Sequence, residues 1–193
     1  MDIINRVKNI LTVPKTEWTA IEGENTPHVK LFTTYVLPLA VIPAVAAFIG
    51  YGLIGYSVLG FRVGSVGLGI RQAVTQFIVS AAGVYLTAFI INFLAENFGA
   101  KKNLDKAFSL VAYAYTPMFI GGIFYILPSL SILASLAGLY GLYLLYIGMQ
   151  PLMKSPEDKT TVYFVVSLLT MIVVYAVLGV VLGIILGLNA TLL

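Results

Sequence analysis

The sequence contains no cysteine, one histidine and few charged residues. Without cysteine the chain cannot form disulfides, thiolate nucleophiles or cysteine-ligated metal sites. Charged residues make up 10% of the chain, against about 25% in an average soluble domain, whereas hydrophobic residues make up 60%. So few charges cannot cover the apolar surface of a chain of 193 residues in water. The composition, with a mean hydropathy of +0.98, therefore predicts an integral membrane protein.

Four long stretches lack both charged side chains and histidine: residues 31–61, 72–95, 107–153 and 160–193. A helix needs about 20 apolar residues to cross a bilayer, so the third stretch is long enough for two crossings. Pro128 and Ser129 lie at its middle and predict the turn between them. The stretches also lack the alternation of polar and apolar residues that is typical of barrel strands. We predict an all-α, polytopic membrane domain over residues 31–193, a five-helix bundle with spans near 31–54, 70–94, 107–127, 131–152 and 161–188.

Lysine and arginine are distributed unevenly between alternate connections. One side of the predicted membrane domain receives nine cations: Arg6, Lys8, Lys15, Lys30, Lys101, Lys102, Lys106, Lys154 and Lys159. The other side receives only Arg62 and Arg71. The positive-inside rule then predicts a cytoplasmic N-terminus and, after five spans, a C-terminus on the opposite side. The expected location is the cell membrane, or an endomembrane if the source is a eukaryote.

The leader, residues 1–30, begins with an amphipathic pattern. Its apolar residues Ile3, Ile4, Val7, Ile10 and Leu11 share one helical face. We predict an interfacial helix that places Arg6 and Lys8 among the lipid headgroups, with Trp18 as a membrane-surface anchor. The alternative is that this helix packs against the protein's own cytoplasmic loops.

Residues 50–69 hold seven glycines. Glycine at this density predicts irregular backbone, because it has little preference for helix or strand. A flexible loop is favoured over a re-entrant loop.

The inventory of ionisable groups argues against an enzyme. His28 precedes the first span, and no span interior contains a carboxylate. A catalytic triad, an acid–base pair or a metal site needs such groups to converge. We therefore expect no catalytic residue, metal or cofactor, and no nucleic-acid partner, because the basic residues are explained by topology.

Two spans carry stripes of small or polar residues. Gln72, Gln76, Ser80 and Thr87 share one face of the second span, and such a stripe faces a neighbouring helix or a wet cavity. Helix packing is favoured over a cavity. The small residues Gly179, Gly183 and Gly187 recur every four positions in the fifth span and predict close helix approach, either within the bundle or in a homo-oligomer.

Tyrosines occur at matched depth in the third and fourth spans. Tyr113 and Tyr146 lie about 9 Å from the cytoplasmic ends of their helices, with Tyr115 and Tyr143 slightly deeper. Together with Pro117 and Gly148 they form the best candidate for a functional groove. A buried aromatic seam without a ligand is favoured over that groove.

The sequence resembles the Yip1 family. The resemblance is carried by Ala112–Pro117 (AYAYTP), Pro128, Leu142–Gly148 (LYLLYIG), Pro151, Lys154 and Glu157–Lys159, together with Pro14, Trp18 and the five spans. It covers about residues 1–185. Eukaryotic members are five-span proteins of the early secretory pathway that interact with Rab GTPases. Their acidic Asp-Leu-Tyr-Gly-Pro signature is absent from this leader, so the chain looks like the prokaryotic branch.

The resemblance implies a non-enzymatic protein that engages protein partners or shapes membrane assembly. We therefore predict a membrane adaptor or scaffold in the lipid bilayer, with the leader and the basic loops as its contact surface. The alternative is a transporter or channel that handles a small solute or a lipid through a neutral polar pathway. A hydrated cavity that reaches mid-membrane would favour the alternative, whereas a dry bundle would favour the adaptor.

Overall fold

A computed structural model describes residues 2–58 and 61–185 of the chain. Two short helices form the leader, α1 (Ile3–Thr12) and α2 (Pro14–Glu22). The first span combines α3 (His28–Leu31) and α4 (Leu37–Ala47), and the second is α5 (Val66–Leu94). The third contains α6 (Leu104–Ala114) and α7 (Thr116–Gly121). The last two are α8 (Ser131–Met153) and α9 (Glu157–Ile185).

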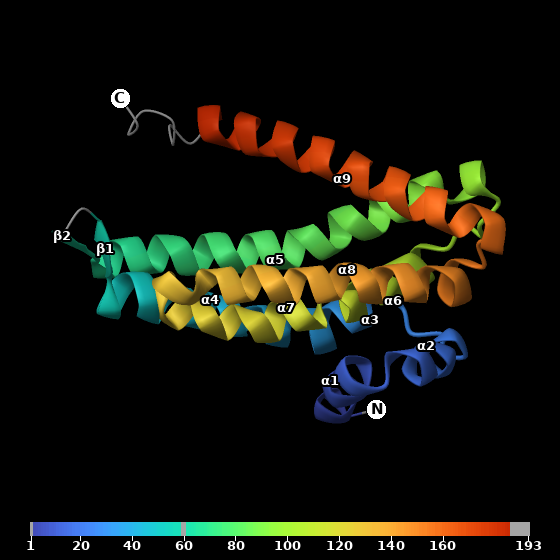
Figure 1. Ribbon diagram of the computed structural model, residues 1–193, viewed down its shortest axis with the longest axis horizontal. Coiled ribbons are helices and arrows are strands. Elements are labelled where there is room, and N and C mark those ends of the chain that lie inside the picture. The colour runs from blue at the N-terminus through green and yellow to red at the C-terminus, as the bar shows by residue number, and fades with distance from the viewer. Residues whose placement is uncertain (1, 59–60, 186–193) are drawn as a thin grey trace.

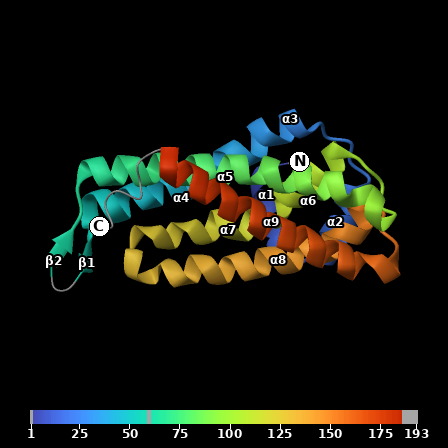
Figure 2. The same cartoon turned by 90° about the horizontal axis from the view of Figure 1, so that it is seen from above.

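The five predicted spans are confirmed as helices that are long and apolar enough to cross a membrane. Their bounds are His28–Ile54, Val66–Phe98, Leu104–Ile126, Pro128–Met153 and Glu157–Val177. They run up and down along one axis (Figures 1 and 2). One end of the bundle carries the strands β1 (Tyr56–Val58) and β2 (Phe61–Val63), and we call it the hairpin end. The other carries α2 and is called the leader end. From there α9 diverges from α5 and α8 toward its C-terminal end (Figure 1).

The first span departs from a regular α-helix where proline removes a backbone donor. Pro38 cannot donate to the carbonyl four residues earlier, and its ring crowds that carbonyl. The preceding segment, Phe32–Val36, widens into a π-helical turn in which the Leu37 N–H donates to the Phe32 carbonyl. A second π-helical segment, Phe48–Ile54, extends the helix to its end.

The glycine-rich stretch is more regular than the sequence predicted. Residues 50–54 complete the first span, and β1 pairs with β2 as an antiparallel hairpin. Gly55 has a φ of 74° and turns the chain from helix to strand, a conformation that other residues adopt at a cost. The Arg62 guanidinium donates to the carbonyls of Leu53 and Ile54, which lack helical partners. The expectation of a flexible loop is therefore wrong for the described part of this stretch.

The third span is broken in its middle. α6 ends at Ala114, and Pro117 lies in the first turn of α7, where its missing N–H costs no hydrogen bond. Beyond this break, Gly122 lies against Pro43 of the first span so closely that a Cβ on Gly122 would be 2.4 Å from the Pro43 Cβ. Because Gly122 has no side chain, two proline-containing spans can pack in direct contact.

The bundle has its large buried side chains near the leader end. Those almost fully buried include Trp18, Phe108, Leu110, Leu144, Leu145, Met149, Met153 and Tyr163. Large apolar residues are exposed all around the spans, among them Val74, Ile78, Phe89, Phe93, Leu169, Ile172 and Val173. Such a surface is stable against lipid hydrocarbon but not against water. The fold is therefore that of an all-α, multi-pass membrane protein.

Candidate functional site

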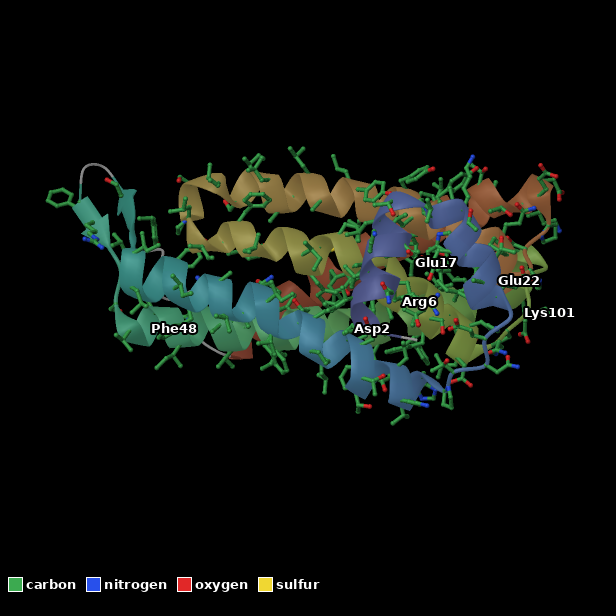
Figure 3. The ribbon with its side chains drawn as sticks, turned by 90° about the horizontal axis from the view of Figure 1, so that it is seen from below. Asp2, Arg6, Glu17, Glu22, Phe48 and Lys101 are labelled. Carbon is green, nitrogen blue, oxygen red and sulfur yellow. The ribbon has the colours of Figure 1, made fainter. Side chains whose placement is uncertain are left out.

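The leader is docked on the protein. Helix α1 runs across the axes of the spans, and α2 then turns toward the leader end (Figure 3). The Tyr140 hydroxyl of α8 donates to the Leu11 carbonyl over 2.9 Å, and Lys154 forms an ion pair with Glu22. The Lys106 ammonium donates to the carbonyls of Glu22 and Glu24 over 2.6 and 2.5 Å, where α2 has ended. Contacts from α6, from α8 and from the residue that follows α8 thus hold the leader in one position.

Arg6 is the centre of this docking. Its side chain leaves α1 and is 3% exposed, and its Nη1 lies 2.5 Å from the Glu17 Oε1 of α2. Its Nη2 forms a second ion pair with Glu24, and the other Glu17 oxygen accepts from Asn9 over 3.1 Å. Two carboxylates therefore compensate the guanidinium for its lost hydration.

The guanidinium also lies over the Tyr113 ring, 5.1 Å from its centroid. That ring packs edge-on against Tyr35, with centroids 4.9 Å apart, and the Tyr35 hydroxyl lies 2.7 Å from the Thr116 Oγ1. Thr116 begins the turn that contains Pro117. The leader is therefore connected through three side chains to the break in the third span.

Burial by itself would lower the pKa of Arg6, but the hydrogen bond that its guanidinium donates to Glu24 and the charges around the guanidinium outweigh burial, and the pKa is raised. A raised pKa means that the ion pairs contribute fully below the pKa of the unfolded chain. Their contribution is lost only as the pH rises through the higher value of the folded state. Arg6 therefore stays charged throughout the neutral range.

Trp18 fixes α2 to the bundle by packing. Its side chain is 1% exposed, and it meets Tyr113 edge-on at a centroid distance of 6.5 Å. Gly148 of α8 makes room for the indole, because a Cβ there would lie 2.6 Å from the Trp18 Cε2. The indole N–H has no hydrogen-bond partner among the described residues, so Trp18 acts through its apolar surface.

These positions correct part of the leader prediction. Arg6 and Trp18 were expected at the membrane surface, but both are buried inside the protein, whereas Lys8 is exposed. An amphipathic helix can bury its apolar face against protein as well as against lipid, and the pattern does not distinguish the two. Arg6 is buried, although the pattern assigned it to the polar face, because the carboxylates of Glu17 and Glu24 bind its guanidinium.

The tyrosine groove is not formed. Tyr113 is buried beneath the leader, and Tyr115 lies on another side of the helix, against α5. Tyr143 and Tyr146 are 44% and 38% exposed on the surface of α8. Residues two positions apart on a helix are separated by about 200° around its axis. A helical wheel could therefore have placed Tyr113 and Tyr115 on different sides of the helix. The prediction compared the depths of the four tyrosines along their helices, but not the directions in which their side chains point.

Instead, a cluster of hydroxyl groups lies between α5, α6 and α9. The Thr87 Oγ1 is 2.8 Å from the Tyr115 hydroxyl and 3.3 Å from that of Tyr175. The Tyr175 hydroxyl donates to the Gly83 carbonyl over 3.0 Å. Gly83 leaves room for that hydroxyl, since a Cβ would lie 2.9 Å from it. Tyr175 was missed in the sequence, although it lies near the middle of the predicted fifth span, 161–188, whereas tyrosines of the membrane interface lie near span ends.

Two cavities adjoin this hydroxyl cluster. The first, of about 240 Å³, is lined by polar groups from α5, including Gln76 and Ser80, and by Tyr125 and Tyr175. The second, of about 480 Å³, is an apolar groove between α8 and α9. Both are bordered by Tyr115, Met118 and Tyr175.

The polar stripe of the second span therefore has two environments. Thr87 is buried in helix packing as the sequence favoured, whereas Gln76 and Ser80 line the first cavity. Gln72 is half-buried one turn closer to the hairpin end. Of the fifth-span glycines, Gly179 and Gly183 belong to α9. Their surroundings and Gly187 lie outside the described residues.

Within residues 2–58 and 61–185, no three histidine or acidic side chains lie close enough to hold a metal ion. The arrangement defines a multi-pass helical membrane protein with a docked leader and a cavity between its spans. Its sequence matches the model of the Yip1 domain over residues 8–188. The chain therefore belongs to the Yip1 family.

Two relatives are both named inner membrane protein YohC, one from Escherichia coli K12 and one from an O6:H1 strain of Escherichia coli. Each is 28% identical over 130 residues, which cover 65% of this chain and 65% of the relative. The chain thus spans slightly less than two thirds of the curated relatives it matches. No solved structure matches it.

Proposed function

We propose that this protein is a non-enzymatic membrane adaptor or scaffold whose docked leader presents a fixed basic surface to protein partners. The observation that carries the proposal is the division of charge within the leader. Glu17 and Glu24 bind Arg6, Glu22 binds Lys154, and Asp2 caps α1. The acids of the leader are therefore engaged within the protein.

The lysines of the leader lie on the outer surface. Lys8, Lys15 and Lys30 are exposed and have no ion-pair partner among the described residues. Exposed apolar side chains lie near them, with Ile4 72% and Val13 51% exposed. A rigid surface that combines cations with apolar side chains suits an acidic protein segment, because little ordering is lost on binding.

The leader end is proposed to face the cytoplasm. Nine of the eleven lysines and arginines lie at this end or in the leader, and two lie toward the hairpin end. This excess supports a cytoplasmic N-terminus by the positive-inside rule. A C-terminus on the opposite side follows from five spans.

The packing of the leader end supports an adaptor over a channel. Between the hydroxyl cluster and this end, Leu110, Leu144, Met149 and Met153 are at most 1% exposed. Buried side chains of this size exclude water from the helix contacts that they fill. The cavities thus have a dry barrier on the leader side within the described part of the chain.

Photocrosslinking in the native membrane tests the adaptor function. A photoreactive amino acid is placed at position 8 or 15 in the full chain, and position 61 at the hairpin end serves as control. We expect one protein adduct from positions 8 and 15 and none of the same mass from position 61, where Phe61 is 77% exposed. Lys15→Glu should abolish the adduct from position 8, since an acidic partner would be repelled.

Two outcomes would contradict the adaptor function. Adducts that contain only lipid would assign the leader to the membrane surface. An adduct that survives Lys15→Glu, or that also forms from position 61, would show contact without the basic surface.

A further inference from the structure

Two polar side chains at membrane depth have no hydrogen-bond partner in the part of the chain that the structure describes. Gln76 and Ser80 form no hydrogen bond with any described residue, and both line the 240 Å³ cavity. At 1.5 Å per residue, Gln76 lies about 8 Å and Ser80 about 14 Å along α5 from Arg71, toward the middle of the span. Burying an amide in hydrocarbon without a hydrogen-bond partner costs several kilocalories per mole of free energy relative to water. A molecule in the cavity that bonds to these groups would remove that cost.

The second cavity limits what that molecule can be. The groove between α8 and α9 is lined by Met118, Leu142, Leu145, Leu168 and Met171, and it borders Tyr115 and Tyr175 of the first cavity. Ile172 at its rim is 57% exposed on the surface that faces lipid. The first cavity, a chamber with a mostly apolar lining that carries the Gln76 amide and hydroxyl-bearing residues, thus adjoins an apolar groove that is open to the bilayer. This combination fits an amphiphile with a small polar head and a long apolar tail.

The charge of the head follows from the lining. Among the described residues, neither cavity is lined by a lysine, arginine, aspartate or glutamate. A phosphate or an ammonium group moved into this chamber would lose its hydration without an opposite charge to compensate it. Hydroxyls and an amide can bond instead to an ester, a carbonyl or an alcohol. The head is therefore uncharged.

We propose that the two cavities form one binding site for a neutral-headed membrane lipid. The head, an alcohol or ester as in a diacylglycerol or a polyprenol, bonds to Gln76, Ser80 and the Tyr175 hydroxyl. The tail lies in the groove between α8 and α9. The lipid enters sideways from the bilayer where α9 diverges from α8 (Figure 1). This site is independent of the basic leader surface.

Photolabelling in vesicles tests the site. The full chain is reconstituted in phosphatidylcholine vesicles with a trace of diacylglycerol that carries a diazirine in its acyl chain. A second arm uses a diazirine polyprenol, and a third uses phosphatidylcholine with the same labelled chain. We expect adducts on residues of the groove with at least one neutral probe, at about ten times the yield of the phosphatidylcholine probe, because two hydrogen bonds are gained. The stronger neutral probe identifies the tail that the groove accepts.

Paired variants separate the site from the general lipid surface. Gln76→Leu with Tyr175→Phe should lower labelling by a neutral probe about tenfold, whereas Tyr143→Phe on the surface of α8 should not change it. Gly138→Leu should also block the groove. Its Cβ would be 3.9 Å from the Met118 Cγ, an ordinary contact, so the variant can fold. Gly67→Leu, with nothing within 4 Å of its Cβ, is the matched control.

The proposal is overturned if the phosphatidylcholine probe labels the groove as strongly as both neutral probes. It is overturned equally if Gly138→Leu and the Gln76→Leu/Tyr175→Phe pair leave labelling unchanged in folded protein. The adaptor function does not depend on either result, because its crosslinks arise from the leader.

Discussion

The two ends of the bundle are stabilised in different ways. At the leader end, bulky side chains such as Trp18, Phe108 and Tyr163 fill the space between helices, and a docked leader adds an outer layer. Toward the hairpin end, glycines allow backbones to touch, as Gly50 does at the Tyr125 carbonyl. The side bordered by α9 is left with cavities there. The leader end is therefore stabilised by large side chains and ion pairs, whereas the cavities beside α9 leave room for the proposed lipid.

The largest expected effect is at Trp18. Trp18→Ala removes a fully buried indole and leaves a cavity above Gly148, so we expect a loss of about 3–5 kcal/mol in stability. The control Phe61→Ala removes an aromatic ring that is 77% exposed at the hairpin end and should change little. Unfolding midpoints in detergent, followed by circular dichroism, measure both. Equal losses of stability in Trp18→Ala and Phe61→Ala would mean that the leader end is not packed more tightly than the hairpin end.

A slightly smaller effect is expected at Arg6. Arg6→Met leaves the buried Glu17 carboxylate without its cation, which should destabilise the protein by about 3 kcal/mol and expose the leader to protease. Arg6→Met combined with Glu17→Met should recover most of that stability, because a buried ion pair can be replaced by apolar residues of similar size. If the double variant is as unstable as the single one, the leader is held by packing and not by charge.

The spans could be predicted because membrane helices must be long and almost free of charge. The predicted end of the first span, residue 54, agrees with the structure, and the other bounds that fall on described residues differ by at most four residues. The predicted end of the fifth span, residue 188, lies outside the described residues. The fold class and the five crossings therefore follow from the distribution of a small number of ionised residues.

The candidate site could not be predicted in the same way. The Arg6 pair with Glu17 joins residues eleven positions apart, and the Thr87 and Tyr175 hydroxyls belong to different spans. Sequence periodicity describes one helix at a time, so it cannot show which faces of two helices meet. It did identify Gln76 and Ser80 as unusual, because polar side chains are costly at membrane depth.

The close backbone contact at the hairpin end gives the third prediction. A Cβ on Gly50 would lie 2.0 Å from the Tyr125 carbonyl oxygen, which is part of the backbone and cannot rotate away. We expect Gly50→Ala to cost about 1–3 kcal/mol, by the same unfolding measurement. Gly67→Ala, in open space at the start of α5, should be neutral or stabilise the helix by up to about 1 kcal/mol. A harmless Gly50→Ala would show that the two spans are further apart.

The smallest effects compare two tyrosine hydroxyls on α9. The Tyr163 hydroxyl donates to the Ile91 carbonyl in the sealed leader end, where no water can replace it. Tyr163→Phe should therefore cost about 1 kcal/mol. Tyr175 lines both cavities, and a molecule in the chamber can replace the bond of its hydroxyl to the Gly83 carbonyl. Tyr175→Phe should cost less than half as much in stability while still weakening lipid labelling. The reverse order would mean that the chamber is dry and empty and that Tyr175 serves only to hold α9 against α5.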